Sequence, residues 1–388
     1  MSARIFDFAL PTAIRSGPGA RNDVAEIIKS RGAKRPFLML DSALNGHLEC
    51  RALIDAIRAA HSDLGVELHP GGEPELSQAI DSGGRLAEHG ADLIVALGGG
   101  SVIDLAKAAA YLQHHPDFQW GDGVAETVEG AATPLIAVPT TCGTGSEVSR
   151  SAVLGDKANR RKLSMRGAPM RPALAIVDPD LIATLPKNLV AWTGMDALTH
   201  AIEAHIARCA TPVASLFAIE AMRLLFGNLE AAHADIAGDA RAREAVMRAA
   251  TLAGVAFSNS DVAGVHCLSE TLGAFYGTPH GLGNAALLVP MLEYQREAAA
   301  PALARAARAV WPAETGGFDG ERAAALLIAR IRSLADALEI PSFSTLNIPP
   351  AEFSEIAEEA ARNGSNPSNP REMGPADYRA LLDALAAA

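Results

Sequence analysis

Residues 92–107 read Asp92-Leu-Ile-Val-Ala-Leu97-Gly98-Gly99-Gly100-Ser101-Val-Ile-Asp104-Leu-Ala-Lys107. An apolar run that ends at glycine is typical of a strand buried on both faces of a parallel sheet. The glycines let a ligand approach the backbone closely, and the N–H groups at the start of the following helix, with Ser101, can bind a pyrophosphate. The spacing is not the G-x-G-x-x-G fingerprint, so a tight strand-to-helix turn without a ligand explains this stretch equally well.

A second apolar run leads into a comparable loop. Residues 135–138 precede Pro139-Thr140-Thr141-Cys142-Gly143-Thr144-Gly145-Ser146-Glu147, which is rich in hydroxyl groups and glycine. Two phosphate-type loops at the carboxyl ends of neighbouring strands suggest a dinucleotide cleft. Asp41 ends another apolar run and can accept hydrogen bonds from adenosine ribose hydroxyls while repelling a 2′-phosphate. A strand-end Asp also serves as a helix cap. On the first interpretation the cofactor is NAD, with NADP as the alternative.

The N-terminal half alternates between expected strands and helices. Strands are predicted at 35–41, 66–69, 92–97, 135–138 and 172–177, and helices at 21–29, 48–60 and 75–89. This order predicts an α/β domain with a mostly parallel, doubly wound sheet. After Pro186 the chain becomes alanine-rich and is expected to be all-helical, with helices near 196–208, 213–226, 241–257, 265–276, 302–310 and 321–338. We therefore predict a nucleotide-binding α/β domain over 1–186 and a helical metal-binding domain over 187–388.

Half of a metal site is suggested by Thr193-Gly-Met-Asp196-Ala-Leu-Thr-His200-Ala-Ile-Glu203-Ala. Asp196 and His200 are four residues apart in a segment that favours helix, so both side chains project from one face. A carboxylate and an imidazole that converge in this way can ligate a transition metal. The same pair also occurs by chance on helix surfaces that bind nothing.

The second half of the site is suggested by His266 and His280. They are fourteen residues apart, which on one continuous helix would separate them by roughly 21 Å, too far for ligands of one ion. Gly277-Thr-Pro279 supplies a break at which the chain can fold back. Three imidazoles and one carboxylate form a borderline site that Fe²⁺ or Zn²⁺ could fill.

Composition describes the protein that carries these motifs. The 388 residues are 49% hydrophobic and 20% charged, enough for a large core in two domains. No uninterrupted apolar run reaches the roughly 20 residues of a membrane span. Charged residues near the N-terminus interrupt the stretch in which a signal peptide would have its apolar core, so we expect a cytoplasmic protein. The net charge of −12 argues against nucleic acid or an anionic membrane as the main partner. The four cysteines contain no C-x-x-C pair, which favours free thiols.

Taken together, the motifs resemble the iron-containing (group III) alcohol dehydrogenase family over nearly the whole chain. The residues that carry the resemblance are Gly98-Gly-Gly-Ser101-x-x-Asp104, Pro139-Thr-Thr-x-Gly-Thr-Gly-Ser-Glu147, Asp178-Pro179, Gly194-Met-Asp-Ala-x-x-His200-x-x-Glu203-Ala and Pro279-His280-Gly281. The resemblance implies a dehydroquinate-synthase-like architecture, in which a divalent metal lies between a nucleotide-binding α/β domain and a helical domain. It implies metal ligation by Asp196, His200, His266 and His280.

The resemblance also implies nucleotide contacts and a reaction. The contacts would fall on Asp41, Gly98, Gly99, Gly100, Ser101, Asp104, Thr140, Thr141, Thr144 and Lys162. The metal would lower the pKa of an alcohol, from which hydride passes to the nicotinamide, and in reverse would polarise an aldehyde. The expected partners are a small primary alcohol or aldehyde and a second copy of the chain in a homodimer.

One position departs from the family pattern. Many relatives have a second histidine one helical turn after the first metal histidine of this segment, and here that position is Glu270. A carboxylate beside the metal would disfavour anionic substrates such as keto acids. We expect Glu270 to orient His266 or a water, or to line the substrate channel. A fifth metal ligand and a solvated helix residue are the alternatives.

Three other functions compete with alcohol oxidation. A zinc-dependent glycerol or polyol dehydrogenase would use the same ligands. A dehydroquinate-synthase-type lyase would share the fold, but its strongly basic substrate pocket is not evident in this sequence. A non-catalytic nucleotide- or metal-binding regulator is disfavoured because all four candidate ligands are present.

Overall fold

The structure, a computed structural model, describes residues 5–121 and 123–387. The described chain forms two compact units. Unit 1 contains residues 5–9, 186–235 and 252–387, and unit 2 contains residues 10–185 and 236–251.

A six-stranded sheet lies at the centre of unit 2. Its strands, in spatial order, are β1 (Ala13–Ser16), β9 (Leu174–Val177), β6 (Leu135–Pro139), β4 (Leu93–Gly98), β2 (Pro36–Asp41) and β3 (Gly65–His69). All neighbouring pairs are parallel, which confirms the predicted parallel sheet, and β1 is a sixth strand that was not predicted. Because β4 lies between β6 and β2, the two glycine-containing loops and Asp41 follow adjacent strands at one edge of the sheet.

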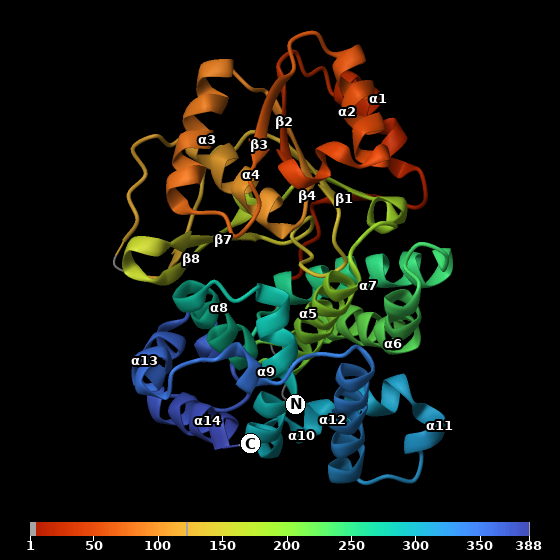
Figure 1. Cartoon of the computed structure of the whole chain (residues 1–388), viewed down its shortest axis with the longest axis vertical. Helices are drawn as coiled ribbons and strands as arrows, with labels where there is room; N and C mark the ends of the chain where they lie inside the picture. Colours follow the sequence, from red (N-terminus) through yellow and green to blue (C-terminus); the bar gives the residue numbers. More distant parts are fainter. Residues whose placement is uncertain (1–4, 122, 388) are drawn as a thin grey trace. The chain divides into compact units, whose positions relative to one another are not determined.

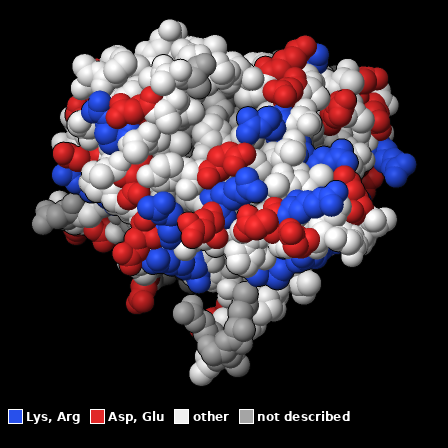
Figure 2. All heavy atoms as spheres, turned by 90° about the horizontal axis from the view of Figure 1, so that it is seen from below, with Lys and Arg blue, Asp and Glu red and all other residues white. Residues whose placement is uncertain are grey.

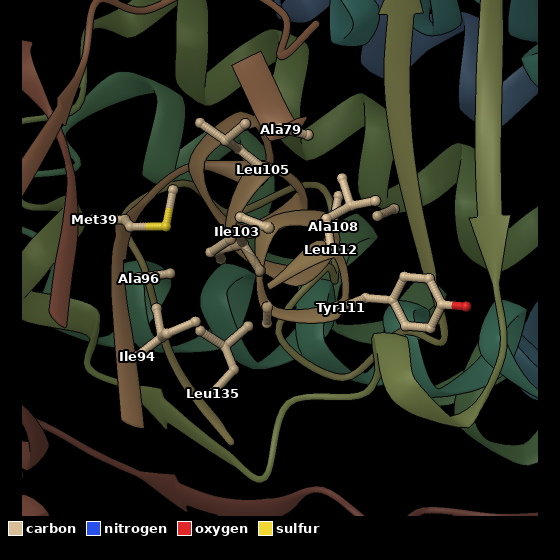
Figure 3. Packing of buried hydrophobic residues seen from close by; sticks show 14 of the residues in the cluster. Met39, Ala79, Ile94, Ala96, Ile103, Leu105, Ala108, Tyr111, Leu112 and Leu135 are labelled. Carbon is tan, nitrogen blue, oxygen red and sulfur yellow. The ribbon is translucent and has the colours of Figure 1, made fainter. Parts of the chain in front are cut away.

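Helices pack against both faces of this sheet. Those on one face are α1 (Val24–Ser30) and α2 (Leu48–Ala60), and those on the other are α3 (Leu76–His89) and α4 (Gly100–Leu112) (Figure 1). Each face carries its own cluster of buried hydrophobic residues. Within β2, Leu38 belongs to the cluster beneath α1 and α2, and Met39 belongs to the cluster beneath α3 and α4, as the alternation of side chains along a strand requires. Figure 3 shows the cluster beneath α3 and α4, in which Met39 and Ile94 lie close to Ile103 of α4.

A smaller sheet in unit 2 was not predicted. It consists of β5 (Ala125–Thr127), β8 (Arg161–Arg166) and β7 (Ser151–Asp156), with β7 and β8 antiparallel. Strand β8 buries Leu163 and Met165 while Lys162 and Ser164 between and beside them are half-buried. Such short strands with a polar face give a weaker sequence signal than the buried strands of the main sheet.

Unit 1 is helical, as predicted for the C-terminal half. The helices beyond residue 186 are α5 (Lys187–Ile206), α6 (Pro212–Ala234), α7 (Ala240–Ser258), α8 (Gly264–Tyr276), α9 (His280–Tyr294), α10 (Arg296–Val310), α11 (Pro312–Thr315), α12 (Gly320–Ala337), α13 (Phe353–Arg362) and α14 (Pro375–Ala387). Residues 236–251, which include the first part of α7, belong to unit 2. Helix α9 was not expected, because glycines follow His280 and Pro290 lies within the helix.

Helix α6 is the one described helix that is long and apolar enough to cross a membrane by length and composition. The core helix of a soluble protein passes the same test. Helix α6 packs against α5, and its apolar sequence is interrupted by the ion pair of Arg223 with Glu220. The face seen in Figure 2 carries basic and acidic side chains interspersed with one another, without an extended patch of one sign.

A buried histidine makes the stability of unit 1 depend on pH. Near the end of α5, His205 Nε2 lies 3.0 Å from the carbonyl oxygen of Ala302, and burial lowers the pKa of His205 to about 4. In the unfolded chain the His205 imidazole binds a proton near pH 6.5, whereas in the folded chain it does so only near pH 4. The stabilisation is therefore complete above pH 6.5 and is lost as the pH falls towards 4.

We expect His205→Gln to remove part of this acid sensitivity, because an amide can still donate to Ala302 and does not titrate. Between pH 6.5 and 4 the free energy of unfolding should fall by about 3 kcal/mol less in the variant than in the wild type. Denaturant titrations at several pH values measure this difference, and exposed His114→Gln is the control. Parallel pH dependences for wild type and variant would contradict the assignment.

Candidate metal centre and nucleotide loops

Helix α5 holds Asp196 and His200 inside unit 1. Both side chains are buried, with Asp196 1% exposed and His200 5% exposed. The helix is buried on all sides over this stretch, with 15 of its residues buried. A helix enclosed in this way can present polar side chains only to partners inside the protein. The pair is thus not a surface coincidence.

Helices α8 and α9 bring His266 and His280 to the same place. Helix α8 ends at Tyr276, and Gly277 follows with a φ of 68°, a left-handed conformation that favours glycine. Pro279 precedes the first residue of α9, His280. The predicted break is confirmed, and the two helices then pack against each other and α9 against α5.

The four side chains converge. One ligand atom from each of Asp196, His200, His266 and His280 lies within 4.8 Å of the others. From Asp196 Oδ1 the distances are 3.7 Å to His200 Nδ1, 3.8 Å to His266 Nε2 and 3.5 Å to His280 Nε2. Donor atoms about 2.1 Å from one cation in tetrahedral geometry would be about 3.4 Å apart. The donor set and its spacing therefore fit Zn²⁺ or Fe²⁺.

A residue without a predicted role, Glu203, orients this cluster. Its carboxylate is buried and accepts hydrogen bonds from the backbone N–H groups of Ala263 (2.9 Å) and Val265 (2.7 Å) and from His266 Nδ1 (2.6 Å). Because Nδ1 donates to Glu203, the neutral ring presents the lone pair of Nε2 towards Asp196. Burial acts to lower the pKa of His266, but the hydrogen bond and charge of Glu203, together with the charges of Asp196 and Glu270, outweigh burial and the pKa is raised. The sequence signal was the position of Glu203 seven residues after Asp196, on the same helix face.

A second residue without a predicted role, Asn284, touches three members of the cluster. It lies one turn after His280 on α9 and is fully buried. Its Nδ2 is 2.6 Å from Asp196 Oδ1 and 3.1 Å from Nε2 of both His266 and His280. The four-residue spacing between His280 and Asn284 indicates that both lie on the same face of a helix. It does not predict the contacts of Asn284 with α5 and α8.

Glu270 lies outside the group of converging ligand atoms found among the described residues. It follows His266 by one turn of α8 and is half-buried. Its carboxylate accepts a 2.7 Å hydrogen bond from Asn363, in the loop after α13. Its charge also contributes to the raised pKa of His266, after the larger effects of burial, Glu203 and Asp196. Glu270 is therefore electrostatically coupled to the cluster.

In unit 2 the two predicted nucleotide loops pack against each other. A Cβ at Gly99 would lie 3.1 Å from the Thr141 side chain, and a Cβ at Gly100 would lie 2.7 Å from the Thr144 side chain. A Cβ at Gly98 would meet Val102 at 2.7 Å. The glycines are thus needed for close packing at the start of α4, where Ser101 and the N–H groups of the first turn lie. Thr140 is buried at the end of β6.

Asp104 has protein partners of its own. Lys107 Nζ lies 3.2 Å from Asp104 Oδ1, 2.7 Å from Ser146 Oγ and 2.9 Å from Ser149 Oγ. The other oxygen of Asp104 accepts a 3.0 Å hydrogen bond from Val153 N–H. Burial lowers the pKa of Lys107, with Asp104 acting in the opposite direction. This ion pair connects α4 to the loop that follows β6. No role for Lys107 was predicted from the sequence.

Asp41 and Lys162, the remaining predicted nucleotide contacts, also have protein partners. Asp41 Oδ1 accepts a 2.9 Å hydrogen bond from Ala43 N–H and thereby caps the short 3₁₀ helix Ser42–Gly46. Both interpretations of Asp41 are compatible with this contact, because its second oxygen can still accept hydrogen bonds. Lys162 forms an ion pair with Glu73.

Comparison with known proteins identifies the family. The family model described as "Iron-containing alcohol dehydrogenase" matches residues 11–179, and the C-terminal model of the Fe-containing alcohol dehydrogenase family matches residues 190–386. A 1,3-propanediol dehydrogenase of Citrobacter freundii is 34% identical over 96% of both chains. An NAD-dependent methanol dehydrogenase of Bacillus methanolicus is 32% identical over 94% of this chain and 96% of its own.

A crystal structure of a 1,3-propanediol oxidoreductase superposes with a TM-score of 0.91 at 32% identity, covering 98% of this chain and 100% of its own. These matches are all to dehydrogenases or oxidoreductases, and they give the lyase alternative no support. The matched models and relatives span the sheet with its loops as well as the helices that carry the four converging side chains. The chain belongs to the iron-containing alcohol dehydrogenase family.

Proposed function

We propose that this protein is an NAD-linked dehydrogenase that interconverts a small primary alcohol and its aldehyde at a divalent metal centre. The observation that carries the proposal is the convergence of four ligand atoms from Asp196, His200, His266 and His280. Family membership supports the reaction type, and the methanol and propanediol dehydrogenases among the relatives support a small, uncharged alcohol.

The four ligands would differ in their access to substrate. The side chains of Asp196, His200 and His266 are 2%, 6% and 3% exposed, whereas that of His280 is 31% exposed. A substrate oxygen can therefore approach on the His280 side, while the other three ligands are shielded from water. A bound divalent cation supplies Lewis acidity, which favours deprotonation of an alcohol and polarises an aldehyde. The protein has to position the carbon that donates hydride and to exclude water.

The nucleotide would bind at the loops of unit 2. The residues we propose are Asp41, Gly98, Gly99, Gly100, Ser101, Asp104, Thr140, Thr141, Thr144 and Lys162. The packing of Gly99 on Thr141 and of Gly100 on Thr144 supports one continuous backbone surface for a pyrophosphate. Asp104 would act through Lys107, by holding the second loop in place. NAD is favoured over NADP because the Asp41 carboxylate would repel a 2′-phosphate.

The same proposal includes the organisation of the protein. Residues 1–186 would bind the nucleotide, and residues 187–388 would bind the metal. The protein would be a cytoplasmic homodimer. Zn²⁺ in place of Fe²⁺ is the second candidate for the metal, since the donor set suits both ions.

The metal centre is tested by His280→Ala. We expect metal affinity to fall by more than about 100-fold and activity to fall with it, because removal of a ligand exceeds the 10–100-fold effect of losing an outer hydrogen-bond partner. Glu203→Gln should show that smaller effect, and exposed His114→Ala should show none. Metal content, circular dichroism and turnover are measured on the same samples. Wild-type turnover by metal-free His280→Ala would refute the centre.

Cofactor choice is tested at Asp41. Wild type should use NAD(H) more efficiently than NADP(H). In Asp41→Gly the ratio of kcat/KM with NAD(H) to kcat/KM with NADP(H) should fall by about tenfold or more, which narrows or inverts the preference, because the 2′-phosphate is no longer repelled. Asp41→Asn should do the same while preserving the cap on Ala43. Asp63→Gly, at an exposed position, is the control. More efficient use of NADP(H) by wild type would leave Asp41 with only its capping role.

Substrate preference is tested at Glu270. Glu270→Gln keeps the side-chain shape and removes the charge near His266, so metal should be retained while kcat or its pH profile changes. The ratio of kcat/KM for carboxylate-bearing to neutral aldehydes should rise, because one negative charge is lost. Loss of metal would make Glu270 a ligand. Unchanged kinetics at every pH would make it an inert helix residue.

A further inference from the structure

The Asn284 amide lies at the point on which the metal ligands converge. Its Nδ2 is 2.6 Å from Asp196 Oδ1, 3.1 Å from His266 Nε2 and 3.1 Å from His280 Nε2. The direction of the amide follows from its neighbours: an ionised carboxylate oxygen only accepts, and in the neutral His266 ring Nε2 is the acceptor because Nδ1 donates to Glu203. Reversal of the amide would place Oδ1 against these acceptors.

The amide is held on one side only. An NH₂ group has two hydrogens, so Asn284 can satisfy two of its three acceptors at once. Its Oδ1 is buried and has no hydrogen-bond partner among the described residues. Asn284 therefore keeps its place through contacts of Nδ2 with metal-ligand atoms, and nothing among the described residues anchors the carbonyl end. A side chain bound in this way can be displaced by any group that takes over those lone pairs.

We propose that Asn284 is an internal competitor for the metal ion. The inference rests on the proposed metal centre and goes beyond it. The N–H group and a cation would use the same Nε2 lone pairs of His266 and His280, so cation binding must break the hydrogen bonds of Asn284 to these two rings. The amide partly neutralises the buried Asp196 carboxylate and lowers the affinity of the site, which keeps the ion exchangeable. Asn284 is thus a positioning residue for the ligands and sets the metal affinity.

The experiment compares Zn²⁺ binding by wild type and Asn284→Ala. Both are stripped with a chelator and titrated with Zn²⁺ against a competing chromophoric chelator. We expect the variant to bind Zn²⁺ about tenfold or more tightly, because the hydrogen bonds to the two Nε2 atoms no longer have to be broken and the amide no longer partly neutralises Asp196. The stripped variant should also unfold at a temperature lower by about 2–4 °C or more, because Asp196 loses its donor.

Three further measurements make the result decisive. Asn284→Ser keeps a polar side chain that is too short for the three contacts and should behave like Asn284→Ala, so a folding defect in one variant can be recognised with the other. The control is Asn228→Ala, which removes an amide that donates to a backbone carbonyl on α6 and should leave Zn²⁺ affinity unchanged. The off-rate of Zn²⁺ into excess chelator should fall in both Asn284 variants.

Unchanged or weaker Zn²⁺ affinity in folded Asn284 variants, with a wild type that binds one equivalent, would overturn the competitor role and leave the proposed function intact. A wild type that binds no stoichiometric Zn²⁺ would overturn the proposed metal centre and the competitor role together. A purely structural asparagine would lower the unfolding temperature of the stripped protein without increasing Zn²⁺ affinity. The combination of tighter binding and lower stability therefore separates the two roles.

Discussion

The Glu203 carboxylate connects helix α5 to the first turn of helix α8, and the geometry of the cluster depends on this connection. A buried carboxylate is stable only when hydrogen bonds replace its hydration, and Glu203 accepts three. Two of the donors are N–H groups at the start of α8, where backbone donors lack helical partners and the helix dipole favours a negative charge. The third is the imidazole of His266. One side chain therefore fixes the start of a helix and the direction of a ligand.

A comparable buried charge organises unit 2. Lys107 is 1% exposed and links Asp104 of its own helix to serines of the loop that follows β6. Replacement of such a pair by a single uncompensated charge is strongly destabilising, by about 3–5 kcal/mol. The pair thus favours one relative placement of the two glycine-containing loops. Their packing through Gly99 and Gly100 is the steric counterpart of this electrostatic link.

The polar surroundings of the metal cluster suggest how selectivity could be adjusted. Glu270 and Asn363 form a hydrogen-bonded pair beside α8 in which the carboxylate is only half-buried. A carboxylate in this position adds negative potential without entering the group of converging side chains, and in the proposed function it would affect charged substrates more than neutral ones. Asn284, in contrast, contacts the converging side chains themselves and, as proposed, would affect the binding of the ion. On these two proposals, the preference for substrate charge and the affinity for metal could change independently of each other.

The sequence alone determined the α/β class of the N-terminal half, the helical class of the C-terminal half and the order of the central strands β2, β3, β4, β6 and β9. Unbroken apolar runs marked the central strands, and the spacing of Asp196 and His200 placed both on one face of a helix. Gly277 and Pro279 marked the chain reversal, because only a few residues adopt those backbone conformations freely. The strands β7 and β8 and the helix α9 gave weak or conflicting local signals and became visible only in the structure.

Tertiary structure decided which side chains meet across long separations. Glu203 and His266 are 63 residues apart, and Asn284 and Asp196 are 88 apart, so no local periodicity can relate them. The partners of Asp104 beyond Lys107, and the pairing of Glu270 with Asn363, likewise arise where separate elements pack. Sequence spacing fixes neighbours along one helix or strand, because the period of each is set by its backbone. Contacts between elements depend on how whole faces fit together, and that fit is a property of the folded chain.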